Sequence, residues 1–225
     1  MREKQEQMLH WIKDTYRNAV MNMSIDEMLF NEYGDIPVLR TYYWDNAYTT
    51  VGYFQKAKDV IVKDFVRRFT GGFTVNHQHD ISYGFIVSSK DWNVYSQDET
   101  YKIIHLAIKK TLEECGIYTI MLKDKAGYSN SICVNTFYTN DLVYRGKKIV
   151  GSCLRRRGSK IMVQGSVHAH LDSDTADLFS RLFAKNLSSS INKSAMEIKL
   201  DDHYIQKALS IAKERYSNNV WNNKY

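Results

Sequence analysis

The sequence predicts one α/β domain of the α+β type, in which helices flank a mixed β-sheet. Its 225 residues, 44% of them hydrophobic, suit a single compact unit with its own core. The β-rich segments outnumber those of a simple strand–helix–strand alternation, which favours a mixed sheet over a doubly wound parallel one. A single proline and the absence of repeats give no sign of a linker. We therefore expect residues 1–225 to form one domain.

The N-terminal part is predicted to be helical over residues 3–32, because apolar side chains such as Trp11, Met23 and Leu29 recur near helical spacing. Residues 35–37 break this helix. Residues 55–65 suit a short helix or a loop. β-branched and aromatic residues predict strands over residues 38–43, 49–52 and 81–88, with a glycine turn over residues 67–75 that feeds another strand.

An amphipathic helix over residues 98–115 is the clearest element of the second half. Ile104, Ile108 and Leu112 share one face of it, and Gly116 supplies its stop. A hairpin is expected around residues 145–147. The remaining predicted elements are strands over residues 117–122, 142–144, 148–150, 160–165 and 167–171, a polar loop over 124–130, and helices over 173–188 and 201–216.

The chain is moderately basic, with a formal charge of +6 and a pI of about 9.0. Such a balance is typical of a lysine-rich surface or of a protein with acidic partners. Nucleic acid is not expected as a partner, because zinc-finger spacing, a helix-turn-helix pattern and RNA-binding signatures are missing. An acidic carrier protein is the alternative, and Arg155, Arg156, Arg157 and Lys160 form the basic cluster predicted to dock it.

Three cysteines, Cys115, Cys133 and Cys153, form no CxxC pair and no even framework, which argues against a secreted disulfide scaffold. The N-terminal segment is too charged for a signal peptide, and no apolar run approaches the roughly 18 residues that span a bilayer. We therefore expect a cytoplasmic protein without membrane partners. His168 and His170 alternate on a strand, but two histidines do not define a metal site.

A glycine-rich stretch over residues 67–77, with the sequence RRFTGGFTVNH, carries the first candidate site. The adjacent Gly71 and Gly72 let the backbone approach a ligand closely, and their N–H groups can face a carbonyl or phosphate oxygen. Arg67 and Arg68 suit an anionic ligand or carrier. These four residues are predicted to bind substrate.

A second stretch, residues 146–152 with the sequence GKKIVGS, contains Lys148, Gly151 and Ser152. Asp141 lies seven residues before Lys148 (148 − 141), and Cys133 lies eight residues before Asp141 (141 − 133). Both stretches combine glycine turns with β-rich sequence. We therefore expect Gly71 and Lys148 to face each other across one pocket.

Together with residues 22–29 and 37–55, these stretches resemble the catalytic domain shared by biotin and lipoate protein ligases and octanoyltransferases. The resemblance covers about residues 18–170 and is closest to the cysteine-dependent octanoyltransferases. It implies Lys148 as the common catalytic lysine and Cys133 as the nucleophile, with His77, Gly151 and Ser152 among the substrate-binding residues. It further implies an octanoyl or lipoyl group as substrate, acyl carrier protein or lipoyl-domain proteins as partners, and no cofactor.

The implied pair makes chemical sense for acyl transfer. A thiol with an ordinary pKa of about 8.5 is mostly protonated at neutral pH, and a nearby ammonium favours the attacking thiolate. A partly desolvated lysine can also accept a proton. Attack on a thioester gives an acyl-cysteine, from which a target lysine amine collects the acyl group. Trp44, Tyr53, Phe73 and Phe85 are predicted to line the acyl pocket.

Two departures from the family pattern keep alternatives open. Phe73 stands where the ligases carry a third glycine and where an arginine is common in the transferases, whereas Asn140 before Asp141 is more ligase-like. The alternative enzyme is an ATP-dependent lipoate–protein ligase, which uses ATP and magnesium to form a lipoyl-adenylate. A binding protein that kept the fold without catalysis is a third interpretation, which Lys148 argues against.

Overall fold

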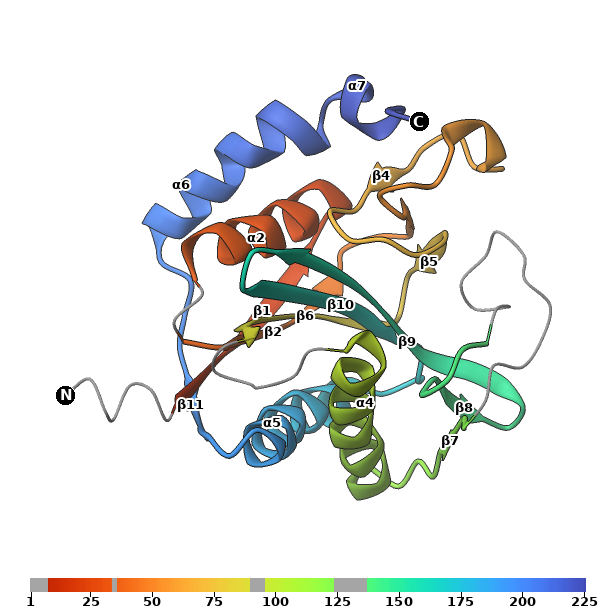
Figure 1. Ribbon diagram of the computed structural model, residues 1–225, viewed down its shortest axis with the longest axis vertical. Helices are drawn as coiled ribbons and strands as arrows, with labels where there is room; N and C mark the ends of the chain where they lie inside the picture. Colours follow the sequence, from red (N-terminus) through yellow and green to blue (C-terminus); the bar gives the residue numbers. More distant parts are fainter. Residues whose placement is uncertain (1–7, 34–35, 90–95, 124–136) are drawn as a thin grey trace.

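An eight-stranded mixed sheet organises the chain in the computed structural model (Figure 1). The strand order is β11-β1-β2-β6-β10-β9-β8-β7, and β1 runs parallel to both β11 and β2 while the other neighbours are antiparallel. A small second sheet has the order β4-β3-β5. The structure describes residues 8–33, 36–89, 96–123 and 137–225.

The elements follow one another along the chain as strands, helices and short helical turns. Their bounds are β1 Met8–Arg17, α2 Ala19–Glu32, β2 Val38–Trp44, β3 Tyr48–Val51, the 3-10 turn η1 Ala57–Asp59, β4 Val66–Arg67, β5 Val75–His77, β6 Ile81–Ser88, α4 Gln97–Glu114, β7 Ile120–Met121, β8 Leu142–Tyr144, β9 Lys147–Arg157, β10 Lys160–Val167, α5 Ser173–Ser190, β11 Ser194–Glu197, α6 Asp202–Ile211, the π-helical turn η3 Ala212–Tyr216 and α7 Asn219–Asn222.

The predicted helix over residues 3–32 is wrong in its first part, because Met8–Arg17 is strand β1. Asn18 explains the change, since its side chain accepts the N–H of Met21 and caps a helix that begins at Ala19. Within β1, Leu9 and Trp11 join one core cluster and Ile12 joins another, which is the alternation of a strand.

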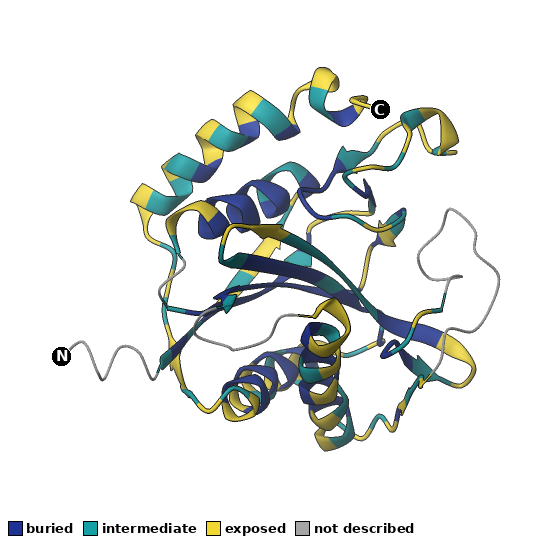
Figure 2. Ribbon diagram, in the orientation of Figure 1, coloured by how far each residue is buried: buried dark blue, intermediate teal, exposed yellow. Residues whose placement is uncertain are grey.

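Helices cover both faces of the large sheet, with α4 and α5 on one side and α2 beneath α6 on the other (Figure 1). Strand β6 shows how the residues divide: Tyr83 and Phe85 pack on the side of α4 and α5, whereas Ile86 packs on the side of α2. The central strands and α2 are buried, and α6 is exposed along its outer side (Figure 2).

The other elements were predicted with smaller errors. Strand β9 extends to Arg157, far beyond residues 148–150, because it pairs along its length with β10. Strand β10 ends at Val167, so of the residues expected over 167–171 only the first is in a strand, and the strand expected over 117–122 is only β7. Strand β11 and helix α7 were not predicted, and the loop expected over 124–130 lies outside the described residues. The mixed sheet flanked by helices is confirmed.

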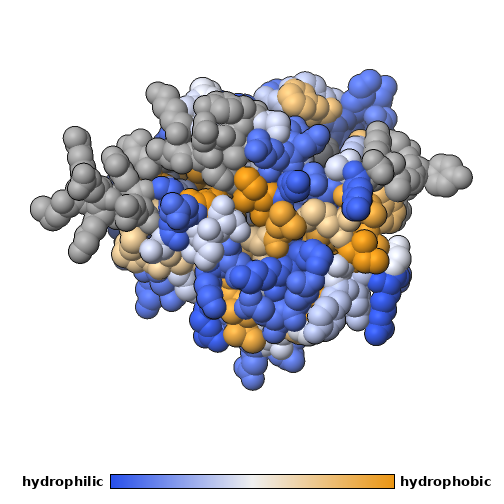
Figure 3. Space-filling model, turned by 60° about the horizontal axis from the view of Figure 1, so that its bottom comes forward, coloured by the Kyte–Doolittle hydropathy of each residue, from blue (hydrophilic) through white to orange (hydrophobic). Residues whose placement is uncertain are grey.

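The surface on the side of α4 and α5 is mainly hydrophilic, with apolar side chains gathered in a band across its middle (Figure 3). Leu106 on α4 and Leu178 on α5 are among the exposed apolar residues. Within the described residues, no helix combines the length and the apolar character that crossing a membrane requires.

A buried ion-pair network joins the first three elements of the chain. The guanidinium of Arg40 lies 2.7 Å from Asp26 on α2 and 2.8 Å from Asp14 on β1. Burial opposes its charge, but the two carboxylates outweigh that cost and raise the pKa of Arg40. Complete burial raises the pKa of Asp26, an effect that Arg40 and Gln164 oppose. Removing one member would leave an uncompensated charge in the core.

Arg40→Leu is therefore expected to lower the free energy of unfolding by about 3–5 kcal/mol, the range for breaking a buried ion pair. The matched control is Lys13→Met, which breaks a partly exposed pair with Asp177 and should cost about 1 kcal/mol or less. Urea unfolding followed by tryptophan fluorescence measures both. Equal losses for the two variants would contradict the importance assigned to the Arg40 network.

Candidate functional site

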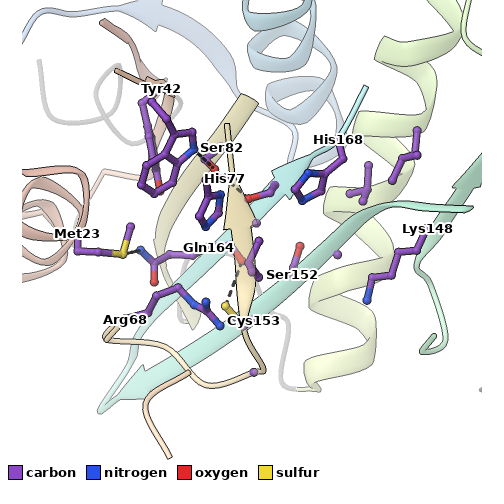
Figure 4. A pocket seen from close by; sticks show the side chains of 18 residues that line it. Met23, Tyr42, Arg68, His77, Ser82, Lys148, Ser152, Cys153, Gln164 and His168 are labelled. Carbon is purple, nitrogen blue, oxygen red and sulfur yellow. Dashed lines mark hydrogen bonds between the residues drawn. The ribbon is translucent and has the colours of Figure 1, made fainter. Parts of the chain in front are cut away.

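The candidate site is a cavity enclosed by α2, the two sheets and a glycine turn, here named the inner cavity (Figure 4). It contains about 570 Å³ of space not filled by protein atoms, part of it open to solvent. Its lining residues are Met23, Tyr42, Trp44, Arg68, Gly72, Val75, His77, Ser82, Lys148, Ile149, Val150, Gly151, Ser152, Cys153, Gln164, Gly165, Ser166 and His168.

A second space, here named the outer hollow, adjoins the inner cavity. Gly72, Lys148, Ser152 and Cys153 line both spaces, so the two meet at these residues. The other residues of the outer hollow are Phe54, Gly71, Phe73, Gln97, Asp98, Tyr101, Tyr138, Thr139, Asp141 and Leu154. The expectation that the glycine turn and Lys148 share one pocket is confirmed.

Lys148 lies near the start of β9 and is almost fully buried. Its Nζ is 2.7 Å from Oδ2 of Asp141, and the same carboxylate oxygen accepts the N–H of Tyr138 at 2.8 Å. Burial raises the pKa of Asp141, and the neighbouring ammonium opposes that rise. A Cβ at Gly151 would lie 2.5 Å from Cε and 2.8 Å from Nζ of the lysine. A larger residue at position 151 would therefore displace the end of the Lys148 side chain.

Arg68 holds the glycine turn in place through hydrogen bonds to its carbonyls. Its guanidinium donates to the carbonyls of Gly71 at 3.1 Å and Phe73 at 2.7 Å, and to Oγ1 of Thr50 at 2.8 Å. Gly72 has a φ of +88°, a conformation that favours glycine. Arg68 lines the inner cavity, but most of its donors already bind the protein's own oxygens, so it shapes the turn that faces the ligand space.

Arg67 lies away from the lining of both spaces. Its side chain is fully buried and donates to the carbonyls of Gly52, Gln55 and Asn222 at 2.8, 2.6 and 3.0 Å. Burial lowers the pKa of Arg67. In this geometry the guanidinium joins the glycine-turn region to the C-terminal segment.

His77 lines the inner cavity and is fixed on three sides. Its Nδ1 is 2.8 Å from Asp80, its Nε2 is 2.8 Å from the hydroxyl of Thr50, and its ring stacks on Trp44 with centroids 4.0 Å apart. Although burial opposes ionisation, His77 holds the pKa of Asp80 well below its ordinary value. The ring orientation of His77 is therefore set before any ligand binds.

Ser152 contacts a residue that the sequence did not point to, His105 of α4. Nε2 of His105 is 2.6 Å from the Ser152 hydroxyl, and its Nδ1 is 2.6 Å from the carbonyl of Asn140. Tyr83 forms a short hydrogen bond with the same hydroxyl. The signal for His105 was a polar residue on the buried face of the helix, which alone does not separate a structural role from a functional one.

Of the three cysteines, Cys133 lies outside the described residues. Cys153 lines both spaces, and its Sγ is 2.9 Å from Oγ1 of Thr70. No role was predicted for it. Cys115 caps the end of α4. Among the described residues, no group of three or more histidine, cysteine, aspartate or glutamate side chains could hold a metal ion.

The predicted acyl-pocket aromatics are divided among three places. Trp44 lines the inner cavity and Phe73 the outer hollow. Phe85 is wrong as a lining residue, because strand alternation turns it into the core beneath α4 and α5. Tyr53 lines neither space and packs instead against Trp221 and Tyr225 near the C-terminus. Met23, Val75, Ile149 and Val150 supply apolar wall that was not predicted.

The basic cluster predicted to dock a carrier also makes contacts within the chain. Arg155 donates to the carbonyl of Phe69 and lies 3.8 Å from the centre of its ring. Lys160 donates to the carbonyls of Phe30 and Asn31. Arg156 is exposed. Part of the cluster therefore supports the fold, and carrier docking by it stays a prediction.

Residues 18–212 match the family described as the lipoyl protein ligase A/B catalytic domain. Octanoyltransferase LipM of Staphylococcus epidermidis is 32% identical over 222 residues, covering 90% of this chain and 77% of the relative. Octanoyltransferase LipM of Brevibacillus brevis is 31% identical over 214 residues, covering 86% and 74%. A bipartite lipoate protein ligase from Thermoplasma acidophilum shares the fold, with a TM-score of 0.77, 17% identity and 96% coverage of each chain.

The burial of His105 predicts a specific pH dependence of stability. Burial lowers the pKa of His105 from 6.5 to about 4, so the unfolded chain binds a proton between these values that the folded chain excludes. The stabilisation is complete above about pH 6.5 and is lost as the pH falls toward 4, by about 3 kcal/mol. Urea unfolding at several pH values should show a flatter profile for His105→Gln than for the wild type. Parallel profiles would contradict this assignment.

Proposed function

This chain belongs to the lipoyl protein ligase A/B catalytic domain family, and from this membership we propose that it is an octanoyltransferase. The substrate is an octanoyl thioester on a carrier protein, and the acceptor is a lysine of a lipoyl domain. The observation that carries the proposal is the buried Lys148–Asp141 pair, placed where the inner cavity meets the outer hollow. A reacting carbonyl at this junction would have its acyl chain on one side and its carrier on the other.

The first half-reaction transfers the octanoyl group to Cys133. The Cys133 thiolate attacks the thioester carbonyl, the carbon–sulfur bond to the carrier breaks, and the carrier leaves as a thiol after taking up a proton. The ammonium of Lys148 favours the attacking thiolate. Backbone N–H groups of Gly71, Gly72 or Gly151 are the candidates to stabilise the oxyanion, since these glycines let the backbone approach the carbonyl.

The second half-reaction moves the group to the acceptor lysine. Its neutral amine attacks the acyl-Cys133 carbonyl, an amide bond forms and the Cys133 thiolate leaves. Lys148, which gives its proton to the leaving carrier thiolate in the first half-reaction, accepts the proton that the amine loses, and Asp141 holds its Nζ in place at 2.7 Å. The transfer needs no nucleotide to activate the acyl group, because the donor thioester is already activated. We therefore propose that neither ATP nor magnesium is needed.

The inner cavity is the proposed site of the octanoyl chain. Met23, Val75, Ile149 and Val150 provide apolar wall, and Trp44 with Tyr42 adds aromatic surface. Burial of each CH₂ contributes about 0.8 kcal/mol, so a chain of about eight carbons gains several kcal/mol. The polar residues of the lining, such as Ser82 and Gln164, already bond to other side chains, which leaves the apolar walls to contact the chain.

The partners are a carrier protein as donor and a lipoyl-domain protein as acceptor. The relatives named octanoyltransferase support the octanoyl group. The +6 balance of this chain suits acidic carriers, whose association it would accelerate at low ionic strength. The proposed location is the cytoplasm, where cysteines stay reduced and available for thioester chemistry.

Intact-mass measurement after mixing the protein with octanoyl-carrier protein, without ATP, tests the mechanism. The wild type is expected to gain one octanoyl group and to lose it when a lipoyl domain is added. Cys133→Ser should abolish both the gain and the transfer, because a hydroxyl is a far poorer nucleophile without a dedicated base. Lys148→Ala should slow both half-reactions by about 10²–10⁴-fold, the usual contribution of a positioned acid or base.

The matched control is Cys115→Ser, at the far end of α4, which should leave both half-reactions unchanged. The ligase alternative gives the opposite pattern: activity would need ATP and magnesium, would survive Cys133→Ser and would still fail without Lys148. Running the same variants with and without ATP therefore separates the two enzymes.

The acyl pocket predicts selection by chain length. Transfer rates should be highest near eight carbons and fall for longer chains, because CH₂ groups that extend beyond the apolar walls do not gain the about 0.8 kcal/mol that each buried CH₂ contributes. Rates measured with a carrier loaded with acyl chains of about four to about sixteen carbons test this. A flat profile over that series would mean that the inner cavity does not hold the chain.

A further inference from the structure

His105 is hydrogen-bonded to two segments of the candidate site, both next to Lys148. It lies on α4 with only 1% of its surface exposed, and it bonds Asn140 through Nδ1 and Ser152 through Nε2, both at 2.6 Å. Asn140 immediately precedes Asp141, the partner of Lys148. Ser152 immediately follows Gly151, whose backbone borders the same lysine. One imidazole therefore contacts both sides of the Lys148 environment.

The bonding partners of His105 permit one arrangement of protons. A carbonyl oxygen only accepts, so Nδ1 carries a hydrogen and donates it to Asn140. Burial lowers the pKa of His105 to about 4, so the ring is neutral at pH 7 and Nε2 is an acceptor. Ser152 donates its hydroxyl hydrogen to Nε2 and accepts one from Tyr83. The hydroxyl of Ser152 thus has no hydrogen left to offer a substrate.

The carbonyl that His105 holds belongs to a residue in an uncommon conformation. Asn140 has a φ of +73°, which asparagine tolerates better than most residues but which still needs support from its surroundings. Its amide N–H donates to the carbonyl of Leu122 at 2.9 Å and its side chain to that of Asp98 at 3.2 Å. Among the described residues, His105 is the donor to the Asn140 carbonyl, at 2.6 Å.

We propose that His105 is a positioning residue for Lys148, acting through the Asn140 carbonyl and the Asp141 carboxylate. By fixing Asn140, it sets the direction from which the Asp141 carboxylate reaches Nζ. The consequence for catalysis rests on the proposed octanoyl transfer, whereas the consequence for the placement of Lys148 does not. The role is one of geometry, because the ring nitrogens bond to Asn140 and Ser152, which lie on either side of the Lys148 environment.

A nucleophilic serine activated by His105 is the obvious competing interpretation, and two observations argue against it. The hydroxyl of Ser152 is also bonded to Tyr83, which is fully buried in the core that packs on α4 and α5. A base whose pKa is about 4 also has little tendency to take a proton from a hydroxyl near neutral pH.

Two substitutions separate the bonds of His105. In His105→Asn the amide N–H₂ stands at the position of Nδ1 and keeps the donor to Asn140. In His105→Gln the amide reaches the position of Nε2, and the bond to Asn140 is lost. The readout is the rate at which limiting acetic anhydride labels Lys148, measured by peptide mass spectrometry relative to exposed lysines. This readout needs no substrate, so it decides the proposal even if octanoyl transfer fails.

His105→Gln is expected to label Lys148 about fivefold faster than the wild type, the factor that one hydrogen bond of ordinary net strength supplies. His105→Asn and Ser152→Ala should remain near the wild-type rate, since both keep the Asn140 bond. The matched control is Thr111→Val, which removes two buried hydrogen bonds, to Ala107 and from Asn186, further along α4 and should not change the labelling. Equal labelling of all five proteins would overturn the proposal, and so would faster labelling in Ser152→Ala.

If the chain transfers octanoyl groups, the same variants give a second readout. His105→Gln should lower kcat with little change in KM, because the misplaced amine affects reaction more than binding, and His105→Asn should restore kcat. A loss that follows stability alone would appear equally in Thr111→Val. That result would overturn the positioning role, while absence of transfer by the wild type would count against the proposed function only.

Discussion

The need to pair one buried guanidinium governs how the first half of the chain meets the second. Arg40 is fully buried, and its charge is sustained by Asp14 on β1 and Asp26 on α2. Asp26 also accepts from the side-chain amide of Gln164 on β10, and the Oε1 of that amide accepts from the hydroxyl of Thr70 at the glycine turn. Since these polar groups are largely shielded from water, each needs a partner within the protein, and the hydrogen bonds lead from the core to the inner cavity.

In and around the same site, three glycines lie very close to other parts of the chain. A Cβ at Gly84 would lie 2.8 Å from Oδ1 of Asp26, and a Cβ at Gly151 would lie 2.5 Å from Cε of Lys148. A Cβ at Gly52 would overlap the carbonyl of Gly72. At Gly52 the neighbouring backbone leaves no room for a side chain, and at Gly84 and Gly151 a side chain would displace Asp26 or Lys148, so these glycines act through the space they leave.

Local sequence predicted the elements whose signals are local. Helix α4 and the hairpin between β8 and β9 have an amphipathic pattern and a glycine turn of their own, and both are present. Strand β1 was missed because its apolar spacing also suits a helix, and parallel pairing with β2 and β11 decides between them. The site residues divide in the same way: the motifs identified Lys148 and the glycine turn, whereas no local pattern shows that His105 meets Asn140.

The proposed chemistry depends on this combination of a motif and its surroundings. A lysine alone on a strand is a common surface feature, but Lys148 is buried, and burial of an ammonium is costly unless it is paired. Asp141 supplies that pair, and it can do so only because the chain turns through Asn140 at a positive φ. The same arrangement keeps the amine at the junction of the two spaces, where a thioester would present its carbonyl. The position, charge and access of Lys148 are thus set by segments far apart in the sequence. The local motif therefore predicted the lysine itself but not its surroundings.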